Sequence, residues 1–219
     1  QEQGSPAGRA GRGGRRKLTT DGQPLEGEPG TNVLEAAAKL GIEIPHYCYH
    51  PDIGVEGNCR MCLVQVGDAT RKLPIACMLP CAEGMVVHTA SPAVVKARKG
   101  VMEFLLINHP LDCTICDQAG ECPLQDYSYR FGPGDSRFVE DKGRKQKHVP
   151  FSEKVMFDGE RCILCTRCVR FFTELRDSNP IGVVNMGGKS TISLGPNGPI
   201  DDPYQMNIID ACPVGALTS

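Results

Sequence analysis

Short runs of apolar and β-branched residues alternate with turn residues over the first ninety positions, and this pattern predicts a small sheet with one helix. A strand pair is expected around Asp21-Gly22, because Asp-Gly favours the two-residue turn of a hairpin. After Pro29-Gly30, Asn32 and Glu35 have the spacing of a helix capping box, and Gly41 marks the helix end. Three later runs have the composition of strands, namely 63–66, 73–76 and 85–89.

Helical periodicity begins beyond residue 90. Ser91-Pro92 is a favourable helix start, with serine as the cap and proline in the first turn, and Pro110 ends the helix. This places His109 in the last helical turn, close in sequence to Cys113. The predicted apolar stripe consists of Val94, Ala97, Val101, Phe104 and Leu105.

The rest of the chain predicts less regular structure. Residues 127–150 are rich in glycine and basic side chains, and we expect them to form a solvated connector. The remaining predicted elements are a helix from residue 162 through 172, a hairpin of 183–184 and 191–192 around Gly187-Gly188, and a helical turn over 207–211.

Composition changes this picture, because twelve cysteines in 219 residues are an excess. No apolar signal segment opens the sequence, and four Cys-x2-Cys pairs favour metal binding over disulfides. Residues 1–17 carry five Arg and Lys against one Glu and are predicted to be a disordered basic tail. Because the net charge is −2, the remainder is acidic, which argues against a nucleic-acid-binding body.

The most diagnostic cysteine group is Cys162, Cys165 and Cys168, with Cys212-Pro213 farther along. In bacterial ferredoxins a Cys-x2-Cys-x2-Cys run supplies three ligands of a [4Fe-4S] cluster, and a later Cys-Pro supplies the fourth. A second cluster in this segment would need a cysteine at position 172, where the chain has Phe172. Zinc sites more naturally use two separated Cys-x2-Cys pairs. The group therefore predicts a single [4Fe-4S] cluster.

The middle group is His109, Cys113, Cys116 and Cys122. One histidine and three cysteines also form a familiar zinc site, so the spacing alone leaves zinc and an iron-sulfur cluster open. The presence of a [4Fe-4S] motif elsewhere in the chain favours the interpretation of His109 as a ligand over that of an ordinary core histidine.

The first group is Cys48, Cys59 and Cys62, with a fourth ligand at Cys77 or Cys81. Its first loop is longer than in the plant-type spacing Cys-x4-Cys-x2-Cys. We choose Cys77, which ends a predicted strand. With Cys81 set aside, eleven cysteines and His109 make twelve ligands, which divide into three fourfold sites.

Together the motifs resemble the N-terminal part of the large iron-sulfur subunit of respiratory complex I, NADH:quinone oxidoreductase. The resemblance covers residues 18–219, and an acidic-Gly-Met turn at Glu83-Gly-Met85 follows Cys77 as the family pattern requires. The segments that carry it are 45–51 around Cys48, 57–64 around Cys59 and Cys62, 109–126, 161–171, and 207–218 around Cys212.

The resemblance implies one [2Fe-2S] cluster and two [4Fe-4S] clusters. Its ligand sets are Cys48, Cys59, Cys62 and Cys77 for [2Fe-2S], His109, Cys113, Cys116 and Cys122 for one [4Fe-4S], and Cys162, Cys165, Cys168 and Cys212 for the other. The implied fold is α+β: a β-grasp [2Fe-2S] ferredoxin-like domain (18–90), a helical His/Cys-ligated [4Fe-4S] segment (91–149) and a single-cluster [4Fe-4S] ferredoxin-like domain (150–219). Cys81 is then expected to have no redox role.

The implied function is electron relay from a flavin- and NADH-binding partner toward a quinone-side iron-sulfur partner, with no catalytic acid, base or nucleophile in the chain. No Gly-x-Gly-x-x-Gly fingerprint follows a predicted strand, and the longest apolar run, 104–107, cannot span a bilayer. Membrane contact is therefore expected only through partners, on the cytoplasmic side of a bacterial inner membrane or the matrix side in mitochondria.

Two alternatives stay open. Members of the family usually continue past the third cluster, whereas this sequence stops at Ser219, which is either a truncated subunit or a short form such as the diaphorase-type subunit of an NAD-reducing hydrogenase or formate dehydrogenase. A zinc-stabilised interaction module is the alternative from another class. Arg60, Arg161 and Arg167 could tune cluster charge or be ordinary surface arginines.

Overall fold

The computed structural model describes residues 14–219, so most of the predicted basic tail lies outside the described residues. Backbone packing divides the chain into two units, one comprising residues up to Ile44 with Cys62–Val94, the other Pro45–Met61 with Val95–Ser219. This division differs from the predicted one in two respects. The segment Pro45–Met61 groups with the second unit, and residues 95–149 and 150–219 form one unit instead of two.

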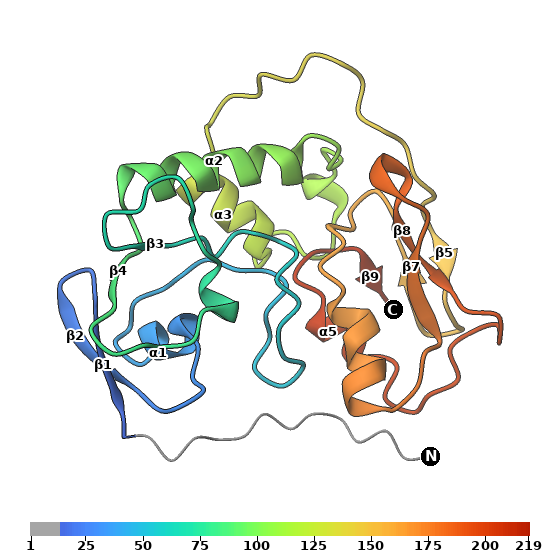
Figure 1. Ribbon diagram of the computed structural model, residues 1–219. Coiled ribbons are helices and arrows are strands. Elements are labelled where there is room, and N and C mark those ends of the chain that lie inside the picture. Colours follow the sequence, from blue (N-terminus) through green and yellow to red (C-terminus); the bar gives the residue numbers. More distant parts are fainter. Residues whose placement is uncertain (1–13) are drawn as a thin grey trace. The chain divides into compact units, whose positions relative to one another are not determined.

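The first unit contains a four-stranded mixed sheet in the order β2-β1-β4-β3 (Figure 1). The predicted hairpin is confirmed: Asp21 and Gly22 both have positive φ, of 49° and 80°, as its two-residue turn requires. β1 begins two residues inside the predicted tail because Arg16 and Lys17 pair with the opposite strand. The strands are β1 Arg16–Thr20, β2 Gln23–Gly27, β3 Gln65–Val66 and β4 Val86–His88; β1 and β4 are parallel, and the other two pairs are antiparallel.

The helix of this unit, α1, spans Val33–Ala38 and has the predicted cap. The Glu35 amide donates to Asn32 Oδ1 over 2.9 Å, and Asn32 Nδ2 donates to Glu35 Oε1 over 2.8 Å. The strand predicted over 73–76 is wrong. Only a single bridge joins Leu63 to Ile75, and the chain then turns into a 3-10 helix at Ala76–Met78.

Two helices dominate the first part of the second unit (Figure 1). α2 spans Pro92–Leu106, so it ends earlier than expected, and His109 lies in the following turn, where its amide donates to the Leu106 carbonyl over 3.1 Å. Phe104, assigned to the buried stripe, is 80% exposed. α3, Pro123–Phe131, starts directly after Cys122, so the first residues of the predicted connector are helical.

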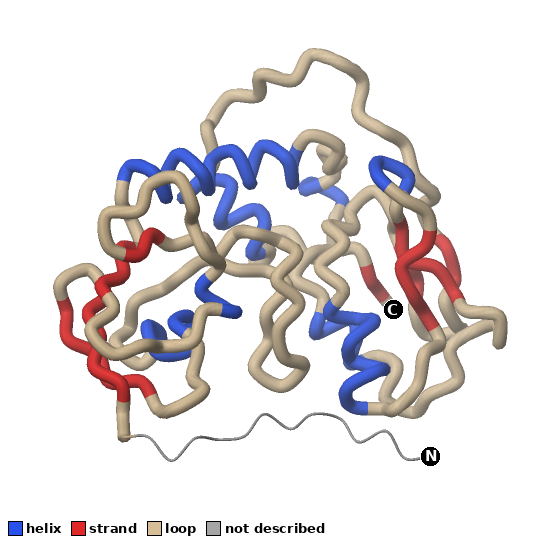
Figure 2. The backbone as a smooth tube through the Cα atoms, in the orientation of Figure 1, coloured by secondary structure: helices blue, strands red, loops and turns tan. Residues whose placement is uncertain are grey.

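The later part of the second unit consists of short elements joined by long loops (Figure 2). The predicted hairpin is confirmed as β7 Ile181–Val184 paired antiparallel with β8 Thr191–Leu194, and the last helical turn as α5 Asn207–Ala211. The helix predicted from residue 162 starts later, as α4 Arg167–Arg170 with a π-helical continuation Phe171–Leu175. An antiparallel sheet is formed by β5 Val149–Pro150, β6 Met156–Phe157 and β9 Leu217–Thr218.

One apolar core explains why the second unit is not divided. It includes Tyr47 from the first cysteine loop, Met102 from α2 and Leu124 from α3, together with Phe151 and Phe172. The Tyr47 hydroxyl contacts Met102 Sδ at 3.4 Å. In the described part of the chain, no helix is long and apolar enough to span a bilayer.

Candidate metal centres

The third cysteine group surrounds a small cavity. Cys162, Cys165 and Cys168 lie on the loop and first turn of α4, and Cys212 follows α5. All four line one cavity of about 20 Å³, whose other walls are apolar except for Thr166 and include Phe157, Ile192 and Leu217. The structure therefore brings together the four predicted ligands, which come from segments more than forty residues apart.

The chemistry of these four thiols fits a metal cluster. Burial raises the pKa of Cys162, Cys165 and Cys212 to about 12, and it raises the pKa of Cys168 well above the ordinary thiol value. The negative charges of neighbouring thiolates add to the effect at each position. Four thiolates can therefore share this apolar site only if cations lie among them, which a cluster of iron ions supplies.

The ligand loop holds two non-glycine residues in left-handed backbone conformations. Leu164 has φ of 54° and Thr166 has φ of 61°, which are unusual for side chains of this kind. These turns bend the chain between successive cysteines, and the Leu164 amide lies 3.4 Å from Cys162 Sγ. No sequence pattern indicated them, because neither residue type favours positive φ.

The middle group lines a second cavity, of about 120 Å³. His109, Cys113, Cys116 and Cys122 all contribute to its wall, together with Asp112, Arg161 and Gly215. Burial lowers the pKa of His109 to about 4, assisted by the nearby cations Lys142 and Arg161. The imidazole is therefore neutral at pH 7, which is the form that binds metal.

The backbone that follows Cys212 of the third group lies close to Cys116 of the middle group. A Cβ atom built on Gly215, three residues after Cys212, would lie only 2.2 Å from Cys116 Sγ. Cys122 Sγ also lies 3.9 Å from the Pro213 carbonyl oxygen. The segment that follows the last ligand of one group thus forms part of the wall of the other.

The first group has two of its cysteines in each unit. In the second unit, Cys48 and Cys59 are buried and hydrogen-bonded to each other, an interaction that raises the pKa of Cys59 above its ordinary value. Arg60, directly after Cys59, has φ of 58°, another left-handed residue inside a ligand loop.

In the first unit, Cys62 and Cys77 are both buried. The amide of Ala76 donates to the Cys62 carbonyl over 2.9 Å, which joins the two cysteine segments. Cys81 lies elsewhere: a Cβ on Gly27 would come within 2.8 Å of its Sγ, so its side chain packs against β2. Cys81 is thus in contact with the sheet.

Two arginines of α4, Arg167 and Arg170, hold the loop of the first group. Arg170 Nη1 donates to the carbonyls of Ile53 and Gly54 over 3.0 and 2.9 Å, and Arg170 Nη2 donates to the carbonyl of Cys48. Arg167 Nη2 donates to the Tyr49 carbonyl over 2.6 Å. Arg167 is therefore not an ordinary surface arginine, and its burial lowers the pKa of its guanidinium.

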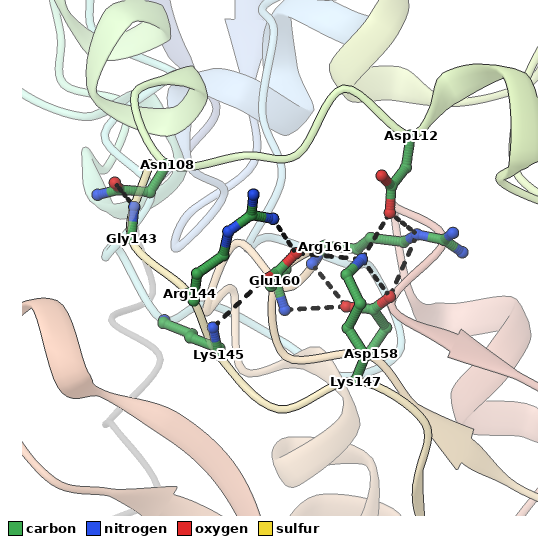
Figure 3. A network of polar contacts seen from close by, with 9 residues as sticks. All are labelled: Asn108, Asp112, Gly143, Arg144, Lys145, Lys147, Asp158, Glu160 and Arg161. Atoms are coloured by element: carbon green, nitrogen blue, oxygen red, sulfur yellow. Dashed lines mark hydrogen bonds and ion pairs between the residues drawn. The ribbon is translucent and has the colours of Figure 1, made fainter. Parts of the chain in front are cut away.

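An ion-pair network lies beside the middle group, and no sequence pattern indicated its partners (Figure 3). Lys147 Nζ lies 2.6 Å from Asp112 Oδ2, 3.0 Å from Asp158 Oδ2 and 3.2 Å from Glu160 Oε2. Arg161 Nε lies 3.2 Å from the same Asp112 oxygen. Lysines of the predicted solvated connector therefore form contacts within the second unit. Lys142 and Lys145, for example, donate to backbone carbonyls.

Among the described residues, no three side chains of His, Cys, Asp or Glu converge where a single metal ion could bind. Cluster ligands are distributed over several iron atoms and therefore surround a volume. The two cavities described above have that arrangement, since each is lined by four predicted ligands.

Three family matches follow one another along the chain. Residues 16–92 match a 2Fe-2S iron-sulfur cluster binding domain. Residues 98–137 match the NADH-ubiquinone oxidoreductase-G iron-sulfur binding region, and residues 152–218 match the ferredoxin-like domain of NADH-quinone oxidoreductase subunit 3. The chain therefore contains a [2Fe-2S]-type domain and [4Fe-4S]-type domains.

Three relatives are named as subunits of NADH-quinone or NADH-ubiquinone oxidoreductase. The NADH-quinone oxidoreductase G subunit of Rickettsia bellii is 48% identical over 93% of this chain and 30% of its own length. The Streptomyces coelicolor protein of that name is 46% identical over 92% of the chain and 24% of its own length. The NADH-ubiquinone oxidoreductase 75 kDa subunit of Reclinomonas americana is 47% identical over 91% of the chain. The chain spans about 30% or less of the length of these relatives.

A solved structure has a similar fold. One chain of a crystal structure of an NAD+-reducing [NiFe]-hydrogenase in the H2-reduced state superposes with a TM-score of 0.81 and 29% identity, covering 93% of this chain and 86% of that chain. The mixed α+β architecture predicted from sequence is thus shared with a redox protein.

Proposed function

Because the chain belongs to the family of the NADH-quinone oxidoreductase G subunit, we propose that it relays single electrons from a flavin- and NADH-binding partner toward a quinone-side partner. We assign the sheet of the first unit to the β-grasp type, with a [2Fe-2S] cluster on Cys48, Cys59, Cys62 and Cys77. The peripheral arm of a membrane-associated complex is its proposed location, on the cytoplasmic or matrix side.

One observation supports this proposal most strongly. Within a single packed unit, two predicted four-ligand sets line two cavities, one with His109 and three cysteines and the other with four cysteines. When bound, [4Fe-4S] clusters would supply one-electron redox chemistry at these positions. The chain's own contribution is to hold the ligands, to bury most of their thiols, Cys113 being exposed, and to keep the His109 imidazole neutral.

The proposed relay would need no catalytic residue. Electron relay requires fixed distances between redox groups and a controlled local charge, and neither requires proton transfer by an acid-base pair. Buried arginines and the close approach of Gly215 to Cys116 supply such rigidity in the second unit. We place Cys81 outside the ligand sets because of its packing against β2.

A second candidate is the corresponding subunit of an NAD-reducing hydrogenase. The hydrogenase chain is matched over most of its length, whereas the relatives from NADH-quinone oxidoreductase are matched over about 30% or less. Identity is higher to the latter relatives, at 46–48% against 29%, and for that reason we prefer the first function.

Metal analysis of anaerobically purified protein tests the proposal. We expect about ten iron atoms per chain with matching acid-labile sulfide, two from a [2Fe-2S] cluster and four from each of two [4Fe-4S] clusters. Stoichiometric zinc without sulfide would instead indicate a zinc-stabilised interaction module. NADH alone should not reduce the chain, and adding the flavoprotein partner should make the reduction fast.

A further inference from the structure

Arg161 occupies an unexpected position relative to the two four-ligand sets. In sequence it directly precedes Cys162, the first ligand of the third group. In the structure it lines the cavity of the middle group, together with His109, Cys113 and Cys116. Its side chain is only 10% exposed, so its charge is shielded from water and acts strongly on nearby groups.

Two carboxylates fix the guanidinium in this position. Arg161 Nε lies 3.2 Å from Asp112 Oδ2 and 3.4 Å from Asp158 Oδ2 (Figure 3). Asp158 is itself held in place, because its Oδ1 accepts hydrogen bonds from the amides of Glu160 and Arg161 and its own amide donates to the Ala216 carbonyl. Figure 3 shows the two terminal nitrogens of Arg161 extending beyond the carboxylates, and no contact is drawn from them to the other residues shown.

The other cations nearby make different contacts. Lys147 shares both carboxylates with Arg161 and, like Arg161, lines a polar cavity of about 290 Å³, but it does not line the cavity of the middle group. Lys142 Nζ donates to the carbonyls of Leu106 and Ile107, at the end of α2. Of these three cations, only Arg161 belongs to the wall shared with the cysteines.

We propose that Arg161 is a positioning and charge-tuning residue for the [4Fe-4S] cluster of the middle group, donating its terminal N–H groups to that cluster and raising its reduction potential. This inference rests on the proposed function. Cluster reduction adds one negative charge, and a buried cation in the wall stabilises the reduced form more than the oxidised form. Hydrogen bonds to cluster or ligand sulfur act in the same direction. The assignment is specific: Arg161 acts on the cluster of the middle group and not chiefly on that of its sequence neighbour Cys162.

The test is a spectroscopic redox titration of the full chain, purified anaerobically, with the two [4Fe-4S] signals followed separately. For Arg161→Gln we expect the reduced-to-oxidised ratio of the middle cluster, at fixed potential, to fall at least tenfold, which corresponds to about 59 mV for a one-electron couple. The third cluster should shift less. An unchanged middle cluster, or a third cluster that shifts equally or more, overturns the inference.

Lys147→Gln is the matched control, because it removes the other cation from the same two carboxylates without changing the wall of the cavity. A shift as large as that of Arg161→Gln would show that uncompensated carboxylates cause the effect, and it would overturn the assignment.

If Arg161→Gln fails to assemble the middle cluster, Arg161→Lys takes its place. A lysine ammonium bound to Asp112 and Asp158 keeps the positive charge but has no second arm for the cluster, so the middle potential should fall by less than with glutamine, and no fall would contradict the proposal. Wild-type protein without [4Fe-4S] signals would instead refute the proposed function itself.

Discussion

Substituting Gly215 tests whether the third and middle ligand groups are held together as the structure indicates. In Gly215→Ala the new Cβ would lie 2.2 Å from Cys116 Sγ and 3.3 Å from Gln118 Cβ, and the first distance is far below contact distance. Either Cys116 or the loop that carries Gly215 must therefore move. Overpacking of this kind typically costs about 1–3 kcal/mol.

The expected outcome follows from what Cys116 can do. A free thiol would rotate away from the methyl group at little cost, whereas a thiolate bound to iron is fixed and transmits the clash to the cluster. We expect Gly215→Ala to lose the middle [4Fe-4S] cluster, wholly or in part, and to retain the other two. With about 1.4 kcal/mol per factor of ten, the cost corresponds to roughly a fivefold to 150-fold lower assembly equilibrium.

Iron and sulfide content together with low-temperature electron paramagnetic resonance of the reduced protein measure this outcome. Gly182→Ala in β7 is the matched control, because nothing lies within 4 Å of its added methyl group. It should retain all three clusters. A Gly215→Ala protein with a full and spectroscopically unaltered middle cluster would refute the reasoning, because it would show that Cys116 is free to move.

Three further predictions concern single residues. Cys77→Ser should remove or strongly disturb the [2Fe-2S] signal, and Cys81→Ser should leave every cluster spectrum intact; the reverse result would transfer the ligand role to Cys81. His109→Cys should lower the midpoint potential of its cluster if the cluster still assembles, because a thiolate adds a negative charge that the neutral imidazole lacks, and redox titration would show no change if His109 were not a ligand. Arg170→Leu should lower the free energy of unfolding by about 3 kcal/mol, since buried carbonyls lose their charged donor, and a loss below about 1 kcal/mol in denaturant unfolding would contradict that role.

Short elements were predictable from the residues that form them. The hairpin at Asp21-Gly22, the Asn32–Glu35 cap of α1 and the hairpin around Gly187-Gly188 were all predictable, because turn and cap preferences depend on residues within a few positions. The errors arose where distant contacts decide the outcome. Residues 73–76 do not form a strand, although their composition favours one, and Phe104 is exposed despite its helical spacing.

For the ligand sets, too, some features were predictable from the sequence and others were not. Spacing predicted eleven of the twelve candidate ligands, since thiolates at two-residue intervals need a metal to share their charge, and Cys77 was chosen over Cys81 because it ends a predicted strand. The approach of Gly215 to Cys116, the left-handed Leu164 and Thr166, and the contacts of Arg170 had no signal in the sequence. Each depends on segments or backbone conformations that spacing does not encode.

Arg161 shows the distinction most clearly. The sequence determined that a cation precedes Cys162, that the candidate ligands can be divided into three sets of four and that the body of the chain is acidic. Only the tertiary structure decided that this cation lines the cavity of the other group, held between Asp112 and Asp158. The physical reason is that ligand identity is a property of residue type and spacing, whereas the electrostatic environment of a ligand depends on side chains that folding brings together from distant positions.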